Sequence, residues 1–221
     1  MDLYEALYTT RAMRRVKPDP IPLDVQQRIM DAAVRAPSGG NQQGWRFLLV
    51  DDLATKEKLA PLYKDAVGKL WETFYAGQLA EAMARPNDPD SISFLKVQKS
   101  ANWLGDHFAE VPLFLFPFTQ FDPTGSSIYP AVWSAMLAAR AEGIGSCITV
   151  ILSFFYPNEV NEILGVPTDE GWAMQGCISM GYPTGTWGVA TRRPAHEVTY
   201  RNAWSADVGF STDEPLWPPK P

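Results

Sequence analysis

Near the start of the chain, hydrophobic residues first recur at helical spacing and then form a continuous apolar run. Residues 2–9 predict a short helix, and residues 23–36 predict a second, in which Val25 and Ile29 belong to one apolar face. A proline and a pair of glycines end that helix. The continuous apolar run 47–50 then predicts a buried strand. A helix followed by a buried strand is typical of a domain that contains both kinds of element.

The rest of the chain continues this mixture. Helices are expected over 55–83, 93–108, 128–142 and from Pro157 to Gly165. Strands are expected over 112–116, 147–151 and 173–182. The proline- and aspartate-rich segment 85–91 predicts a loop. The order lacks an even alternation of strand and helix, and no G-x-G-x-x-G follows a strand, so a Rossmann fold is unsupported.

Length and composition predict a single domain with its own core. The chain has 221 residues, of which 46% are hydrophobic. We expect one domain over 1–204, with a helical cap over about 71–108, and an extended tail over 205–221. The tail combines Trp217 with several prolines, and its apolar side chains would be poorly placed on a free tail. A tail that wraps a partner subunit would bury them.

Charge and cysteine content exclude several classes of function. The net charge of −6 argues against a nucleic-acid partner, which requires clustered basic residues. The N-terminal residues lack the pattern of a secretory signal, and the apolar runs are shorter than the roughly 20 residues that span a membrane. We therefore expect a cytoplasmic protein without a membrane partner. Cys147 and Cys177 are expected to be buried rather than joined in a disulfide or bound to zinc.

Two features carry candidate chemistry. The segment 35–46 places glycines and three side-chain amides between a predicted helix and a strand, which suits a flat ligand that forms hydrogen bonds. Arginines gather near both ends of the chain, at Arg11, Arg14 and Arg15 and at 192–193, and guanidinium groups suit a phosphate. Together they suggest a cofactor with a planar ring and a phosphate. Taken singly, the arginines could be solvated surface charges, and the loop a simple turn.

Three motifs in order resemble those of a known family. They are RAMRR at 11–15, APSGGNQQGW at 36–45, and GYP at 181–183 followed by RRP at 192–194. The first two resemble the R-R-S-x-R and A-P-S-x-x-N-x-Q-P-W patterns of the nitroreductase family. That family comprises FMN-dependent oxidoreductases and also includes flavin reductases and iodotyrosine deiodinase. The resemblance covers nearly the whole chain.

The resemblance implies roles for individual residues. Arg11 and Arg192 correspond to phosphate ligands, and Arg15 to a basic residue at the ribityl chain and the pyrimidine edge of the ring. The loop that begins at Pro37 would lie along the flavin ring of the partner subunit, and the stretch around Ile151, at a strand end, would donate from its backbone toward flavin N5. The complete expected set is Arg11, Ala12, Met13, Arg15, Pro37, Ser38, Gly39, Asn41, Gln43, Ile151, Leu152, Arg192 and Arg193.

The chain also departs from the family pattern. Ala12 and Met13 stand where the family has a second basic residue and a serine, and Gly44 stands where it has a proline. Ala12 could still contribute backbone groups, and Gly44 loosens the turn before Trp45. Arg14 is expected to point away from the cofactor. Neither the histidines nor any other side chain is expected to be catalytic, because the flavin carries the hydride, and no metal is expected.

The resemblance implies an α+β fold with a central, mostly antiparallel sheet flanked by helices. It also implies an intertwined homodimer with two FMN sites at the interface. The implied reaction is a ping-pong transfer from NADPH or NADH to a small planar electrophile, such as a nitroaromatic compound, a quinone or a free flavin. Two alternatives stay open from the sequence. One is a specialised flavin enzyme, such as a reductive dehalogenase, and the other is a protein that sequesters flavin without catalysis.

Overall fold

The computed structural model describes residues 1–218, and contacts within the chain divide it into two units. The larger, Ala12–Gly185, is called the core unit. The smaller, called the terminal unit, combines Met1–Arg11 with the residues from Thr186 onward. The expected boundary between a domain over 1–204 and a tail over 205–221 stays a prediction, and residues 219–221 of that tail lie outside the described residues.

A five-stranded antiparallel sheet forms the centre of the core unit. Its strands are β1 (Trp45–Val50), β2 (Leu113–Thr119), β3 (Gly145–Thr149), β4 (Ala173–Met174) and β5 (Cys177–Gly181). They lie in the order β1-β2-β5-β3, and β4 also pairs with β2. Every residue of β2 is buried because this strand has neighbours on both edges and helices on both faces.

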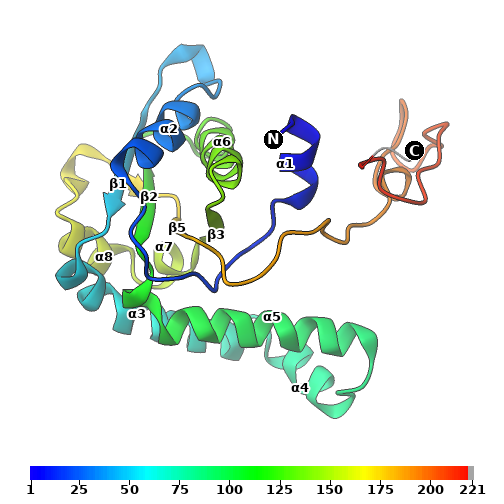
Figure 1. The fold of residues 1–221 in the computed structure, drawn as a ribbon, viewed down its shortest axis with the longest axis horizontal. Coiled ribbons are helices and arrows are strands. Elements are labelled where there is room, and N and C mark those ends of the chain that lie inside the picture. Colours follow the sequence, from blue (N-terminus) through cyan, green and yellow to red (C-terminus); the bar gives the residue numbers. More distant parts are fainter. Residues whose placement is uncertain (219–221) are drawn as a thin grey trace. The chain divides into compact units, whose positions relative to one another are not determined.

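Side chains of β2 alternate between two hydrophobic cores. Phe114, Phe116 and Phe118 belong to the core that packs against α3, α5, α7 and α8, whereas Leu113 and Leu115 belong to the core against α2 and α6. The sheet therefore lies between two layers of helices (Figure 1). The helices of the core unit are α2 (Leu23–Ala33), α3 (Leu53–Thr73), α4 (Ala76–Ala84), α5 (Pro89–Asp106), α6 (Ile128–Ala141), α7 (Ile151–Phe155) and α8 (Pro157–Leu164). This arrangement confirms the expected α+β class with an antiparallel sheet.

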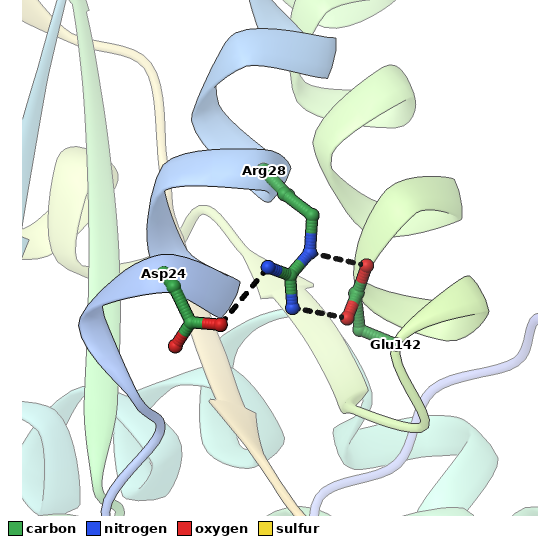
Figure 2. Close-up of polar contacts among 3 residues, drawn as sticks. All are labelled: Asp24, Arg28 and Glu142. Atoms are coloured by element: carbon green, nitrogen blue, oxygen red, sulfur yellow. Dashed lines mark hydrogen bonds and ion pairs between the residues drawn. The ribbon is translucent and has the colours of Figure 1, made fainter.

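An ionic contact joins the two helices on one face of the sheet. Arg28 of α2 donates from Nε and Nη2 to the Glu142 carboxylate, at 2.9 Å each, and from Nη1 to Asp24 at 3.0 Å (Figure 2). Glu142 immediately follows α6. The contact is exposed and solvent screens it, so it contributes little to the stability of the fold.

Three predicted boundaries were wrong. The loop expected over 85–91 ends earlier, because Asp88 caps α5 by accepting hydrogen bonds from the next turn and Pro89 occupies its first position. The single strand expected over 173–182 is two strands, β4 and β5. Pro117 in β2 has no N–H with which to pair with a neighbouring strand. Opposite Pro117, strand β4 ends before Gln175, whose N–H donates to the Pro117 carbonyl at 2.8 Å, and β5 begins two residues later.

The third error concerns the segment after β3. The strand expected over 147–151 covers Gly145–Thr149, and Ile151 begins helix α7. The expected strand end at Ile151 and Leu152 is therefore a helical turn. A short apolar run cannot by its periodicity distinguish a buried strand from a buried helix, and here the helix packs both side chains into the core.

The terminal unit is built around helix α1 (Leu3–Thr9). Asp2 caps the N-terminus of α1, and the Tyr8 carbonyl within α1 accepts a hydrogen bond from Ala190 N–H at 3.2 Å. Farther on, Arg201 Nε donates to the Val208 carbonyl at 2.8 Å. Among its described residues, few are buried: Ala6, Thr9, Thr10 and Val208.

Both cysteines are buried free thiols within the core unit, as expected. Among residues 1–218, no helix has the length and apolar character needed to cross a membrane.

Candidate functional site

The loop after α2 has an unusual and well-defined backbone. Residues Gly39–Asn41 form a short 3₁₀ turn, and Gly40, Asn41 and Gln43 all have φ between 51° and 57°. Residues other than glycine seldom adopt this left-handed region, so the loop needs internal support. Gln43 provides it: its N–H donates to Ser38 Oγ at 3.0 Å, and its side-chain amide donates to Asn41 Oδ1 at 3.3 Å. The segment that resembles a flavin-contacting loop is thus held in one conformation.

A second segment anchors this loop to α6. The N–H of Gly39 donates to Ser127 Oγ at 3.2 Å. Asp122 accepts hydrogen bonds from the backbone of Ser127 and Ile128 at 3.0 and 2.8 Å, which satisfies N–H groups at the start of α6. On the other side of the loop, Trp45 is buried in the core. The exposed side chains of the loop therefore project from a backbone fixed at both ends.

The segment after Arg11 runs along the edge of the sheet. Met13 N–H donates to the Ser146 carbonyl at 2.9 Å, and Val16 forms a bridge with Pro183. Glycines make this close approach possible, since a Cβ at Gly145 would lie 2.7 Å from Met13 Cβ and one at Gly181 would lie 2.7 Å from Val16 Cβ. Ala12 also bridges to Ser146 and is exposed.

Within this segment, Arg14 and Arg15 face different surroundings. Arg14 is half-buried, and its charge acts on two groups of the sheet core: burial raises the pKa of the Cys147 thiol and of Tyr63, and the Arg14 charge opposes both shifts. Arg15 is exposed, and its guanidinium Cζ lies 5.9 Å from the ring centroid of Trp103 on α5. Of the two, Arg15 is the one accessible to a ligand.

The start of α7 presents backbone and aromatic groups rather than charge. Ile151 and Leu152 are buried, so only their backbone could contact a ligand. Phe154, which sequence reasoning missed, is 64% exposed and packs edge-on against Phe74 at the end of α3, with ring centroids 5.3 Å apart. A prediction of helix for residues 151–155 could have indicated that Phe154 is exposed, but this run was interpreted as the end of a strand.

The arginines near the C-terminus line a cavity of the terminal unit, of about 620 Å³. Arg192, Arg193 and Thr10 contribute to its wall, whereas Arg11 does not. Arg192 Nη1 donates to the Thr191 carbonyl at 2.8 Å, and a guanidinium has several further N–H donors. Hydroxyl groups at Thr191 and Thr212 and two carboxylates, Asp213 and Glu214, also line the cavity, whereas the Thr10 hydroxyl already donates within α1. The guanidinium and hydroxyl donors fit a phosphate, and the two carboxylates share the same lining.

Thr10, like Phe154, was not among the expected site residues. It precedes the RAMRR motif directly, and its hydroxyl donates to the Ala6 carbonyl at 2.7 Å within the last turn of α1. In the sequence, the position of Thr10 next to this motif was the feature that could have marked it as a site residue. The structure thus brings Arg192 and Arg193 into one cavity of the terminal unit, and it holds Ala12, Met13 and Arg15 beside the sheet of the core unit.

Comparisons with known proteins agree with this architecture. A protein-family model for the nitroreductase family matches residues 7–182. A NADH dehydrogenase from Thermus thermophilus is 28% identical over 219 residues, which cover 90% of this chain and 95% of the relative. A 5,6-dimethylbenzimidazole synthase from Rhodobacter capsulatus is 30% identical over 195 residues, with 82% and 83% covered.

Among solved structures, an FMN-dependent nitroreductase from Mycobacterium smegmatis in complex with NADPH superposes with a TM-score of 0.65 and 25% identity. The match covers 91% of this chain and all of that protein (100%). The family match spans the arginine-rich segment, the glycine-containing loop and the complete sheet. This chain therefore belongs to the nitroreductase family.

Proposed function

We propose that this protein is an FMN-dependent oxidoreductase that reduces small planar electrophiles, among them nitroaromatic compounds, quinones and free flavins, with NADPH or NADH. The observation that carries the proposal is the loop from Pro37 to Gln43, whose backbone is held in left-handed conformations and whose surface is left open for a flat ligand. Such conformations are costly and are characteristic of binding sites. Family membership supports the identity of the ligand.

The donors of this chain suit the two ends of FMN. Arg192 and Arg193, which line the cavity, would bind the phosphate, because guanidinium groups form strong charge-assisted hydrogen bonds with phosphate oxygens. Arg11, which is not part of that lining, would join them on the strength of its place in the family motif. Arg15 would lie at the pyrimidine edge of the ring, where a positive charge favours the reduced, more negative form. Ala12, Met13, Ile151 and Leu152 would contribute mainly backbone contacts, since these side chains are apolar.

When bound, FMN would supply the redox chemistry, alternating between the nicotinamide donor and the acceptor in a ping-pong cycle, while the protein orients both and excludes water. Two relatives support the choice of donor: one is named a NADH dehydrogenase, and another was solved with NADPH. The exposed aromatic pair Phe74 and Phe154 would favour a flat acceptor over an aliphatic one.

We further propose that the protein acts as a homodimer in which each site combines the arginines of one chain with the Pro37–Gln43 loop of the other. Large apolar side chains are exposed in the terminal unit and on α6, and they need a covering surface. They include Leu3, Tyr4, Trp133, Trp204 and Leu216. A partner chain would bury them and complete the two sites.

The proposed function is tested by the visible spectrum of the purified protein. We expect a yellow preparation, or one that becomes yellow and retains FMN after dialysis, and we expect NADPH to bleach the flavin band within seconds when oxygen is absent. A preparation that stays colourless after FMN is added would rule out the flavin. Retained FMN without bleaching by either nicotinamide would rule out the proposed donor and favour flavin sequestration.

A further inference from the structure

Arg15 has a fixed backbone and a side chain with one aromatic neighbour. Its carbonyl accepts hydrogen bonds from Thr184 N–H at 3.1 Å and from Thr184 Oγ1 at 3.3 Å. The next residue, Val16, is buried against Gly181. The guanidinium, in contrast, is exposed and lies 5.9 Å from the Trp103 ring centroid, within the range of a cation–π contact. Among the described residues, no carboxylate forms an ion pair with it.

Trp103 is itself held rigidly near the end of α5. Its ring stacks on the His107 ring with centroids 4.2 Å apart and planes 11° from parallel. The Trp103 carbonyl lies 2.8 Å from His107 Nδ1 and accepts the His107 backbone N–H at 3.0 Å. The ring is therefore a fixed surface against which a flexible arginine can be held.

We propose that Trp103 is a positioning residue that holds the Arg15 guanidinium in place to stabilise reduced FMN. The inference rests on the proposed function, because it takes Arg15 to lie at the pyrimidine edge of the flavin. A long arginine side chain loses rotamer freedom when it is fixed, and a flat ring beneath it reduces that loss at the moment of binding. Coulomb attraction also weakens with distance, so a displaced guanidinium stabilises the negative charge less.

With this role for Trp103, the segment 71–108 has a second function. It was expected to cap the active site, and Trp103 would in addition link α5 to the redox potential of the cofactor. Because the contact acts on reduced FMN more than on oxidised FMN, removal of the aromatic face would weaken binding of the reduced form selectively. From the strength of exposed cation–π contacts, we expect a loss of about two- to fivefold in that relative affinity. For a two-electron couple this corresponds to a fall of about 10–20 mV in midpoint potential.

The experiment measures the midpoint potential of bound FMN in W103L, W103F and the wild type, together with the dissociation constant of oxidised FMN. The chain offers a matched control in Trp172, whose ring also lies under an arginine, with Arg46 Cζ 5.0 Å from its centroid. We expect a lowered potential in W103L, a potential near that of the wild type in W103F, which keeps an aromatic face, and no change in W172L. Affinity for oxidised FMN should change little in all three.

A double-mutant cycle separates positioning from a general effect on the fold. If Trp103 acts through Arg15, R15Q lowers the potential at least as much as W103L, and W103L adds nothing further in the R15Q background. Additive shifts, an unchanged potential in W103L, or an equal shift in W172L would overturn the inference. Should W103L fail to fold, W103M, which keeps an apolar side chain without an aromatic face, takes its place in the cycle. A wild-type protein that takes up no FMN contradicts the proposed function, whereas bound FMN with a potential insensitive to Trp103 overturns this inference alone.

Discussion

The core unit and the terminal unit differ in how completely they bury their own apolar side chains. In the core unit, every residue of β2 is buried between two layers of helices. In the terminal unit, only Ala6, Thr9, Thr10 and Val208 are buried among its described residues, while Trp204 is 88% exposed. The difference indicates that the core unit closes its own core, whereas the terminal unit carries the arginine-lined cavity on a framework with little core of its own.

The largest expected effect concerns the core unit. Phe114→Ala removes a fully buried ring whose centroid lies 4.0 Å from that of Phe108. We expect the free energy of unfolding to fall by about 3–5 kcal/mol, because the cavity cannot collapse between two helical layers. Urea denaturation measures this change. A loss below about 1 kcal/mol would mean that this core is less tightly packed than the structure indicates.

The next effect concerns the cavity of the terminal unit. Arg192→Ala should weaken FMN binding by about 1.5–3 kcal/mol, roughly ten- to a hundredfold, because one charge-assisted phosphate contact is lost. Fluorescence titration with FMN measures the affinity. Arg85→Ala, which removes an exposed arginine paired with Glu81 on α4, serves as the control and should leave the affinity unchanged. Equal affinity in Arg192→Ala and the wild type would remove Arg192 from the phosphate site.

A third prediction asks what covers the terminal unit. If a partner chain buries Trp204, Trp204→Ala should weaken the dimer by about 2 kcal/mol, since buried tryptophans dominate the energy of interfaces. Sedimentation equilibrium measures the dissociation constant. Met83→Ala, an exposed apolar residue on α4, is the comparison and should have little effect. A dimer that tolerates Trp204→Ala as well as Met83→Ala would show that this side chain stays in solvent.

The smallest effect is the dependence of stability on pH. Hydrogen bonds from Arg28 lower the pKa of both Glu142 and Asp24, whose ordinary values are 4.5 and 3.8. A carboxyl group with a lowered pKa stabilises the fold above its unfolded-state value, and this contribution is lost as the pH falls below it. The difference in melting temperature between wild type and Arg28→Ala should therefore shrink from neutral pH toward acid, and high salt should reduce it throughout. A difference that persists in acid would assign the effect to packing of the arginine stem.

Most of the sheet and the long helices could be predicted from the sequence because their patterns are strong. The apolar run around Phe114 has few alternatives to a buried strand, and the Ala-rich segment 128–142 forms the buried helix α6 as expected. The loop after α2 was located from its proline and glycines, and two of its amide side chains, those of Asn41 and Gln43, do lie together.

What the sequence could not predict depends on contacts distant along the chain. The run from Val150 to Leu152 is rich in β-branched residues, yet it turns into α7 because the space beside α3 accepts a helix. The break between β4 and β5 lies opposite Pro117 in the neighbouring strand, whose carbonyl accepts the Gln175 N–H. Likewise, nothing near Arg15 in the sequence points to Trp103, which comes from a helix more than eighty positions later.

Mixing two damaged chains shows whether each site combines the arginines of one chain with the loop of the other. Arg192→Ala impairs the phosphate side, and Gly39→Phe fills the space beside the loop, where an added Cβ would meet nothing within 4 Å and should leave the fold intact. Each variant alone carries two impaired sites in its dimer, whereas a mixed dimer restores one intact site.

The amount of FMN bound by the co-expressed chains decides the matter. If the two chains share each site, we expect mixed dimers to bind FMN with wild-type affinity at about half of their sites, well above either variant alone. Mixed dimers that bind no more FMN than the two variants prepared separately would contradict it.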